Sequence, residues 1–435
     1  MSKAKWTWLV YMAGDNNLND AADNDIAEMR QVGSTPDVNV VFLCDRAGSG
    51  GMEVKRIGGD GVGEEGYHDQ EGDTGDPETL YTFVAWTKSH YPAERYALII
   101  WNHGSGWEPL EMDRIARTVN AVAYSGREMG VRSGSPLRRA LFRTTLQEVY
   151  RLQTAEQRAI ASDDGTGHSI DTVELGKVIK RICELLGQKL DLLGLDACLM
   201  SSLEVLYEIK DDVRYMVGSV ENEPNDGWPY DVILRRLVDK PGVTTWALAS
   251  GIVTDYMRSY SSYVGPVTQS AFDLEKIGDI EMPLLCLSNV LLRDMADLKY
   301  KIWKAQTRSA NFWGRTLWDL GDWCRAFRRL KPERCVDHAA RCVQESLDEV
   351  GFIIKSESQG RKVRNVAGLS IYLPPELTPV SPYYADLAFA KANLWDEVLA
   401  AYHEDEEPGA RGFVDLYAEA HPEEERALPP GWQPA

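Results

Sequence analysis

The 435-residue sequence is short of positive charge. It contains 47 Lys and Arg against 67 Asp and Glu, which gives a formal net charge of −20 at pH 7. A surface with this excess of negative charge repels the phosphate backbone of nucleic acids and favours basic partners. The composition therefore argues against nucleic-acid binding, although most of the charge is expected to be solvated surface.

Long hydrophobic runs are also missing. No stretch approaches the roughly 20 apolar residues that a membrane-spanning helix needs, so no membrane association is expected. The first apolar run extends only from Trp6 to Ala13. The letters GDNN follow it, where a signal peptide would need a small-residue cleavage site. We interpret this run as a first β-strand and expect the protein to be cytoplasmic.

Cysteine is scarce and irregularly spaced. An odd number of cysteines in a chain of this size, without a secretory signal, argues against a disulfide framework. Reduced thiols are then available for chemistry. Internal repeats are absent as well. The seven cysteines are at positions 44, 183, 198, 286, 324, 335 and 342.

Apolar runs alternate with amphipathic segments in the N-terminal part of the chain. Continuous apolar strands separated by helices are typical of a mostly parallel sheet that is covered on both faces, so the fold class is α/β. The expected strands are 6–13, 38–45, a segment from 96, a segment from 190 and 213–224, and the expected helices are 18–32, 76–91, 172–187 and 201–212.

The chain is long enough for two domains. We expect a first domain over 1–265, a C-terminal α+β region over 266–420, and a flexible tail over 421–435 that is rich in Pro, Gly and acidic residues. The C-terminal region is expected to be helical to about 350, with short strands and a terminal helix after it. Within the first domain, 108–168 has few apolar runs and is interpreted as a long insert.

Two expected strands end on reactive residues. One delivers His103, followed by Gly104, and the other delivers Cys198. Ligands of open α/β sheets bind beyond the carboxyl ends of the strands, so the two side chains are expected to meet there. A nearby imidazole can activate a thiol. The N–H groups of Gly104 and of Cys198, at the start of a helix, could then hold an oxyanion. Taken singly, each residue has a simpler explanation as a core cysteine or a hydrogen-bonded histidine.

Carboxylates cluster around the same position. Asp196 precedes Cys198 by two residues, and Glu221, Glu223 and Asp226 follow the next strand. Carboxylates beside a nucleophilic thiol oppose its ionisation unless they bind something positive, so they favour a cationic substrate side chain. The alternative is that Asp196 caps a helix starting near 199 and Asp226 caps a turn before Gly227. Both explanations stay open at this stage.

Four ordered segments resemble the clostripain family of cysteine peptidases, relatives of the caspases, legumains and gingipains. They cover most of the first 265 residues, whereas the C-terminal third is similar only loosely. The segments are YMAGDNNLN at 11–19, WNHGSGW at 101–107, LDACLMSSLEVLYEI at 195–209 and ENEPNDGWPY at 221–230.

The resemblance implies a caspase-like α/β/α sandwich and an endopeptidase that cleaves protein or peptide substrates after Arg or Lys. By position, His103 and Cys198 would form the catalytic dyad. Asp196 and Asp226 would line the S1 pocket, which binds the basic P1 side chain. Family members are often activated from a zymogen by a cut after a basic residue between the catalytic His and Cys. The arginine-rich insert 108–168 fits such self-processing.

The resemblance does not decide the cofactor. Many relatives are exported, whereas this chain shows no signal, and clostripain itself depends on calcium. The acidic segment 59–76 lacks the EF-hand pattern. We therefore expect no required cofactor and leave Ca²⁺ open. A regulatory partner is expected in general terms, because a basic-specific endopeptidase needs control.

Two alternatives belong to other function classes. A catalytically silent caspase-like scaffold would bind basic peptides with the same acidic pocket. A metal site could form from Cys335, His338 and Cys342, which share one helix face, with Cys324 as a fourth ligand. Their spacing is not a standard zinc pattern, and a half-buried amphipathic helix explains it more simply.

Overall fold

The structure is a computed structural model, and it describes residues 3–14, 19–46, 51–59, 63–69, 72–102, 170–224, 226–349, 351–376, 378–381 and 383–404.

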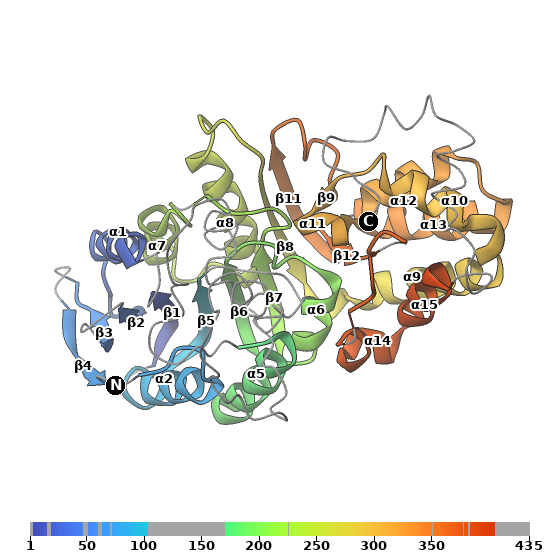
Figure 1. Ribbon diagram of the computed structural model, residues 1–435. Coiled ribbons are helices and arrows are strands. Elements are labelled where there is room, and N and C mark those ends of the chain that lie inside the picture. Colours follow the sequence, from blue (N-terminus) through green and yellow to red (C-terminus); the bar gives the residue numbers. More distant parts are fainter. Residues whose placement is uncertain are drawn as a thin grey trace, which may run out of the picture.

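A nine-stranded sheet forms the centre of the molecule (Figure 1). The strands lie in the order β11-β8-β7-β6-β5-β1-β2-β3-β4. Their bounds are β1 (Ala4–Gly14), β2 (Val38–Arg46), β3 (Met52–Ile57), β4 (Gly63–Asp69), β5 (Ala93–Trp101), β6 (Leu190–Asp196), β7 (Val213–Gly218), β8 (Val267–Asp273) and β11 (Ile353–Gln359).

The middle of the sheet is parallel and both edges are antiparallel. Strands β2, β1, β5, β6 and β7 run parallel to one another. The β3–β4 pair at one edge and the β8–β11 pair at the other run antiparallel. The prediction of an α/β fold with a mostly parallel sheet is therefore confirmed.

The central strands are apolar on both faces because helices cover both. In β1, Trp8 and Val10 pack on one side of the sheet, and Leu9 and Tyr11 pack on the other, all of them buried. The first face is covered by α1 (Asn19–Arg30), α7 (Tyr230–Asp239) and α8 (Thr245–Ser259). The second is covered by α2 (Pro77–His90), α5 (Thr172–Leu186) and α6 (Leu203–Ile209).

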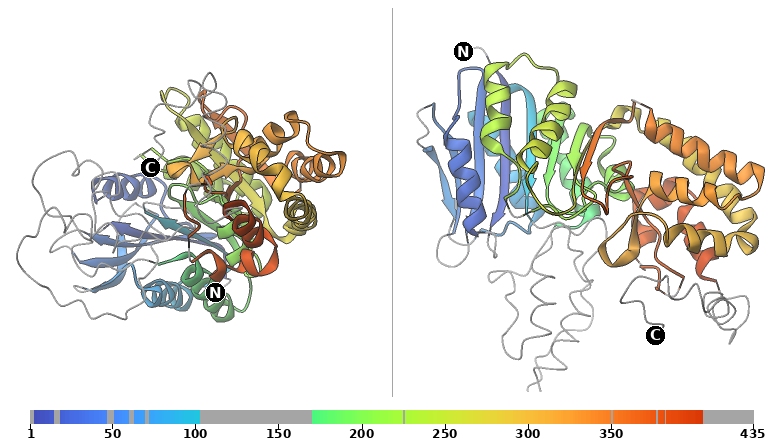
Figure 2. Two further views of the ribbon diagram at one scale, coloured as in Figure 1. Left: turned by 45° about the vertical axis from the view of Figure 1, so that its right-hand side comes forward. Right: turned by 90° about the horizontal axis from the view of Figure 1, so that it is seen from above.

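The C-terminal region packs beside the β8–β11 edge of the sheet (Figure 2). Its apolar side chains belong to the same core as those under α5 and α6. A small sheet of order β12-β10-β9 lies within this region. The elements are α9 (Gly278–Arg293), α10 (Met295–Gln306), β9 (Asn311–Phe312), α11 (Trp313–Thr316), β10 (Leu317–Asp319), α12 (Leu320–Arg329), α13 (Arg334–Asp348), β12 (Ser370–Tyr372), α14 (Ala388–Ala392) and α15 (Trp395–His403).

The predicted boundary near residue 265 stays a prediction, but the central sheet extends across it. Strands β8 and β11 lie beyond 265 and pair antiparallel with each other, and β8 also pairs with β7. The sheet that carries the candidate site therefore uses residues from both predicted regions. The insert 108–168 and the tail 421–435 lie outside the described residues.

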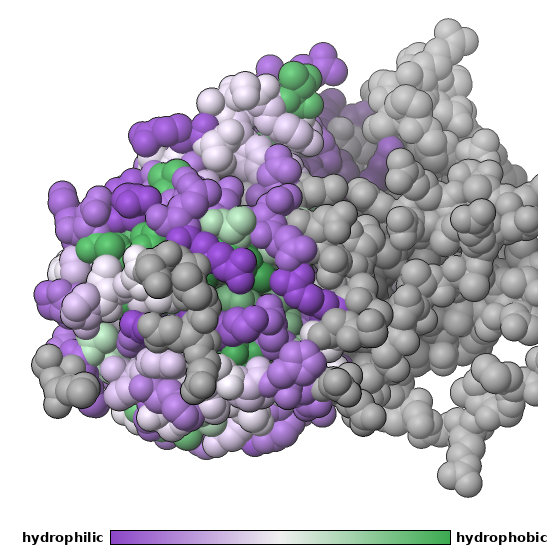
Figure 3. Space-filling model, turned by 90° about the vertical axis from the view of Figure 1, so that its left-hand side faces the viewer, coloured by the Kyte–Doolittle hydropathy of each residue, from purple (hydrophilic) through white to green (hydrophobic). Residues whose placement is uncertain are grey.

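Figure 3 shows the face of the molecule on the β4 side of the sheet. Hydrophilic residues predominate there among the described residues, with hydrophobic ones scattered between them. This distribution fits the expectation that most of the charge is solvated. Among the described helices, none is long and apolar enough to cross a bilayer.

Candidate active site

The strands β5 and β6 end side by side. Trp101 and Asp196, the last residues of the two strands, are register partners. The N–H of Asn102 then donates to the carbonyl oxygen of Asp196, with an N···O distance of 3.3 Å. The exits of both strands therefore lie at one edge of the sheet. His103 and Gly104 follow Asn102 directly but lie outside the described residues, so their roles remain predictions.

Cys198 lies in a turn between β6 and α6. Helix α6 begins at Leu203 rather than near 199, and Ser202 caps it, since the Ser202 hydroxyl accepts from the N–H of Val205. The sequence interpretation was wrong on two points. The helix does not start near 199, and the Cys198 N–H does not lie at a helix start.

The thiol of Cys198 is half-buried and directed to the segment after β7. The backbone N–H of Glu223 donates to its sulfur, with an N···S distance of 3.2 Å. The next residue, Leu199, is buried and has a φ of +66°. Non-glycine residues rarely adopt this conformation, and such strain often marks functional sites.

Asp196 is a buried carboxylate with several hydrogen-bond donors. Its Oδ2 accepts from the hydroxyl of Tyr230 at 2.7 Å and from the N–H of Trp228 at 3.3 Å. Burial raises the pKa of Asp196 to about 6, against the opposing effect of these bonds and of one with Glu223. The alternative that Asp196 caps a helix is therefore wrong.

Glu223 places a second carboxyl group against Asp196. Burial, the charge of Asp196 and the hydrogen bond between the two groups raise the pKa of Glu223 well above its usual value. The amide of Gln269 also donates to Glu223 Oε1 at 3.4 Å. The Glu223 carboxyl therefore holds a proton more tightly than an exposed glutamic acid does, and more tightly than Asp196 does.

Asp25, from helix α1, is a third buried carboxyl group of the cluster. The indole N–H of Trp101 donates to Asp25 Oδ2 at 2.6 Å. Burial and the charge of Asp196 raise the pKa of Asp25 to about 9. It is therefore neutral at pH 7, and Asp196 carries the negative charge.

Asp226 stands at the exposed rim of the cluster. It lies in a turn in which the N–H of Gly227 donates to the carbonyl of Pro224 at 3.1 Å. Gly227 has a φ of +58°, and a Cβ there would lie 3.4 Å from carboxyl oxygens of both Asp25 and Asp196. The turn thus brings Asp226 over the buried carboxyl groups.

An open pocket of about 480 Å³ lies beside this turn, and its lining is largely acidic and polar. The lining residues are Glu221, Asn222, Glu223, Pro224, Asp226, Tyr263 and Pro266.

The carboxyl groups of Asp25, Asp196, Glu223 and Asp226 have no cationic partner among the described residues. Burial raises the pKa values of Asp25, Asp196 and Glu223, and the negative charge of Asp196 raises those of Asp25 and Glu223 further. Such a cluster is costly unless something positive binds to it. A half-buried thiol beyond the carboxyl end of a parallel strand has the position of a nucleophile in an α/β enzyme. A model of the clostripain family matches residues 10–127 and 148–402.

The chain belongs to the clostripain family.

One curated member of the clostripain family is similar to part of the chain. Clostripain from Hathewaya histolytica is 26% identical over 261 residues, which are 54% of this chain and 42% of that protein. The chain thus spans less than half the length of this curated relative.

Two solved structures share the fold over nearly the whole chain. One is an inactive zymogen C11 protease from Parabacteroides distasonis, with a TM-score of 0.60, 19% identity and coverage of 92% of this chain and 98% of that one. The other is a secreted C11 cysteine protease from Bacteroides thetaiotaomicron in complex with an irreversible peptide inhibitor. It gives a TM-score of 0.63, 18% identity and coverage of 91% and 100%. At these identities the likeness establishes the fold only, which confirms the α/β/α sandwich.

The sequence interpretation missed Asp25, although a signal for it was present. Ala22, Asp25, Ile26 and Met29 follow the spacing i, i+3, i+4 and i+7, and all four are buried. An aspartate on the apolar stripe of a helix is a buried polar group that needs a partner. Its partner, Trp101, is brought close only by the sheet.

The alternative of a zinc site on α13 does not hold for the described residues. Cys324 is buried on α12, whereas Cys335 is exposed on α13. Cys342 Sγ lies 3.8 Å from His338 Nε2, but no described group of three ligand atoms includes this pair.

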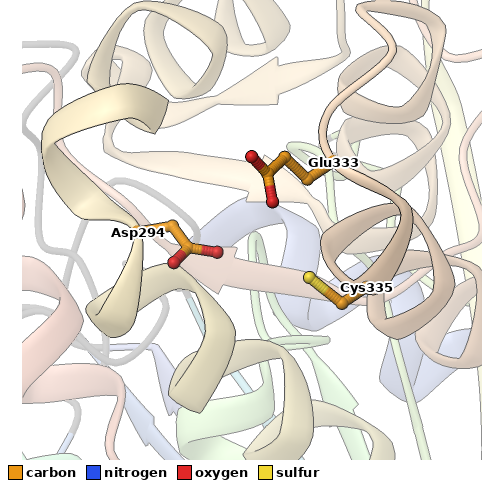
Figure 4. Close-up of side chains that lie close together, drawn as sticks. All are labelled: Asp294, Glu333 and Cys335. Carbon is orange, nitrogen blue, oxygen red and sulfur yellow. The ribbon is translucent and has the colours of Figure 1, made fainter.

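Among the described residues, the side chains of Asp294, Glu333 and Cys335 lie close enough together to share a metal ion (Figure 4). Arg293 already donates to both Asp294 and Cys335 there. Two members of this surface cluster, Asp294 and Cys335, therefore already have a cationic partner.

Among the described residues, no group of side chains offers the oxygen ligands that Ca²⁺ needs. Calcium takes six to eight oxygen ligands, whereas the surface cluster contains a thiol and a neighbouring arginine. In the acidic segment 59–76, the carboxylates of Asp73 and Asp76 accept backbone N–H groups, as turn and cap residues do. No step of the chemistry below involves calcium.

Proposed function

We propose that this clostripain-family chain is a cysteine endopeptidase that cleaves after Arg or Lys, with Cys198 as the nucleophile and His103 as its partner. The observation that carries the proposal is the carboxylate of Asp196, buried beside Cys198 and without a cation among the described residues. A basic P1 side chain would supply the missing positive charge.

In this mechanism the substrate docks with its P1 cation between Asp196 and Asp226. The thiol of Cys198 attacks the scissile carbonyl and forms a thioester, and the N–H groups of Gly104 and Cys198 hold the oxyanion. His103 protonates the leaving amine, and water then hydrolyses the thioester.

Self-cleavage in 108–168 is the second part of the proposal. The insert contains nine arginines, at 114, 117, 127, 132, 138, 139, 143, 151 and 158. Wild-type and Cys198→Ala protein are incubated, and their fragments are mapped by mass spectrometry. Cuts after arginine in the wild type alone support the proposal, and cuts after acidic residues contradict the specificity.

A silent scaffold that binds basic peptides is the competing function. The acidic lining of the pocket beside the Asp226 turn suits a basic side chain whether or not the thiol of Cys198 reacts. Binding of a basic peptide by both wild type and Cys198→Ala, without hydrolysis by either, is the outcome that would establish the scaffold.

A panel of peptides that differ only at P1 tests the main proposal. Hydrolysis is expected for Arg and Lys and not for Leu or Asp, and it is lost in Cys198→Ala and His103→Ala. The matched control is Cys183→Ala, because Cys183 is another reduced cysteine that lies at α5, away from the strand ends. Equal cleavage of all four peptides would contradict the role of the carboxylates.

A further inference from the structure

The turn that carries Cys198 is held by the segment 219–224. The N–H of Ser201 donates to the carbonyl of Ser219 at 2.9 Å, and the N–H of Leu199 donates to that of Glu221 at 3.3 Å. In the opposite direction, the N–H of Glu223 donates to the sulfur of Cys198. These three bonds tie the turn to alternate residues of the flanking segment, Ser219, Glu221 and Glu223.

The turn depends on these bonds because its backbone is strained. Leu199 has a φ of +66°. The left-handed conformation costs a non-glycine residue roughly 1–2 kcal/mol, so it persists only where the surroundings hold it. The position of the Cys198 sulfur is therefore coupled to the position of the flanking segment.

Glu221 anchors the flanking segment. Its side chain is only 4% exposed, and its Oε1 accepts the N–H of Asn222 at 3.0 Å. Its own N–H donates to the hydroxyls of Ser219 and Thr268. A buried carboxylate of this kind requires a cation, or it distorts its surroundings or takes up a proton.

The cation comes from the C-terminal region. Lys362 Nζ lies 2.7 Å from Glu221 Oε2. Lys362 follows strand β11, next to the buried Val363. Gly360, with a φ of +106°, lets the chain turn close to Pro266, whose Cα would lie 3.0 Å from a Cβ at this position. The lysine is thus delivered to Glu221 by a fixed backbone.

We propose that Lys362 is a positioning residue for Cys198, which acts by neutralising Glu221 and so holding the flanking segment against the nucleophile turn. This inference rests on the proposed function only in one respect, because the measurement of kcat requires that the protein cleaves peptides. The reactivity of the Cys198 thiol provides a second readout that needs no peptide cleavage.

Lys362→Met tests the proposal. Side chains displaced by about 1 Å can cost up to a hundredfold in rate, so we expect kcat on a peptidyl-arginine substrate to fall roughly ten- to hundredfold. KM should change little, because Asp196 and Asp226 are untouched. Alkylation of Cys198 by iodoacetamide in the folded protein, followed by mass spectrometry, should change in rate, and Lys362→Arg should restore both readouts. Lys362→Gln is a second neutral variant with the same expectation.

Lys355→Met is the matched control. Lys355 lies on β11, shortly before Lys362 in the chain, and also pairs with a glutamate, Glu357, at 2.8 Å. Neither Lys355 nor Glu357 contacts the flanking segment in a described bond. This variant should keep the wild-type kcat and alkylation rate.

Glu221→Gln separates positioning from a general loss of structure. Without the carboxylate there is no charge for Lys362 to neutralise, so adding Lys362→Met to Glu221→Gln should cause no further loss. Wild-type kcat and alkylation in the neutral Lys362 variants would overturn the proposal, as would an equal loss in the Glu221→Gln background. If folded wild type cleaves no peptide, the proposed function fails, and the alkylation rates still decide the role of Lys362.

Discussion

At the scale of single residues, the buried carboxyl groups of the candidate site differ in pKa. Burial raises the pKa of Asp25 to about 9 and that of Glu223 well above its usual value, whereas hydrogen bonds from Tyr230 and Trp228 limit the rise for Asp196 to about 6. This difference is what lets several acidic residues stand beside Cys198. The difference in pKa also means that replacing Asp25 by Asn and replacing Asp196 by Asn should have different effects on activity.

Asp25→Asn should leave cleavage after arginine nearly unchanged at pH 7, whereas Asp196→Asn should abolish it. Asp25 is already neutral at that pH, because its pKa is raised from 3.8 to about 9. The measurement is kcat/KM for both variants on one peptidyl-arginine substrate. A loss in Asp25→Asn as large as in Asp196→Asn would mean that Asp25 carries charge.

The stability of Asp25→Asn should also depend on pH with a defined sign. The folded protein holds a proton on Asp25 that the unfolded chain releases above about pH 4. The stability that this proton contributes to wild type is complete below pH 4 and is lost as the pH rises toward 9. Melting temperatures between pH 4 and 9 should therefore shift progressively in favour of the variant. A difference that does not vary with pH would contradict the raised pKa.

Tyr230→Phe removes a donor from the charged oxygen of Asp196. A hydrogen bond to a charged group contributes about 1.5–3 kcal/mol, so kcat/KM for an arginine substrate should fall at neutral pH and recover in part at higher pH. The recovery follows because the pKa of Asp196 rises when this bond is lost. Tyr256→Phe is the control, since the buried Tyr256 hydroxyl has no partner among the described residues. Equal pH profiles for the two variants would argue against the bond.

At the scale of secondary-structure elements, the packing of strand β6 requires a glycine at position 194, two residues before Asp196. A Cβ on Gly194 would lie 2.5 Å from Ile99 Cδ1 and 2.8 Å from the ring of Trp228. Gly194→Ala should therefore lower the free energy of unfolding by about 1–3 kcal/mol through overpacking. It should also displace Trp228, whose N–H donates to Asp196.

Gly242→Ala is the matched control for Gly194→Ala, because nothing lies within 4 Å of a Cβ at Gly242. Chemical denaturation of both variants measures the difference. A Gly194→Ala protein as stable as Gly242→Ala would show that Trp228 does not pack against the strand as described.

Many of the strands and helices can be predicted from the sequence. Hydrophobic runs locate β1, β2, β5, β6 and β7 and the intervening helices, because both faces of these strands are buried. Strand β3 is not predicted from the sequence, since it is short, only half of its residues are buried, and glycines precede and follow it. The predicted start of α6 is wrong because a strained turn at Leu199 lies between β6 and the helix. No local sequence pattern indicates this turn.

At the scale of the whole molecule, the C-terminal region is part of the site's support. The N–H of Ser370 donates to the carbonyl of Ser201 at 2.9 Å, so strand β12 adjoins the turn that carries Cys198. Glu204 at the start of α6 accepts from the N–H of Tyr372 and the hydroxyl of Tyr384. These partners lie about 170 positions away in the chain, and sequence pattern alone does not bring them together.

A chain that ends at residue 265 should therefore fail to fold cooperatively. It lacks β8 and β11, and it exposes the edge of β7 and the apolar residues of α6. Thermal unfolding followed by circular dichroism measures this, with a chain that ends at residue 404 as the control. A cooperative transition in the shorter chain would establish 1–265 as an independent domain.

Covalent labelling by a peptidyl-arginine electrophile tests the central claim most directly, with the labelled residue identified by mass spectrometry. The proposed function predicts one label, on Cys198, that forms much more slowly in Asp196→Asn and more slowly with a peptidyl-aspartate electrophile. Labelling of another cysteine, equal rates for the two electrophiles, or no label on well-folded wild type would contradict it.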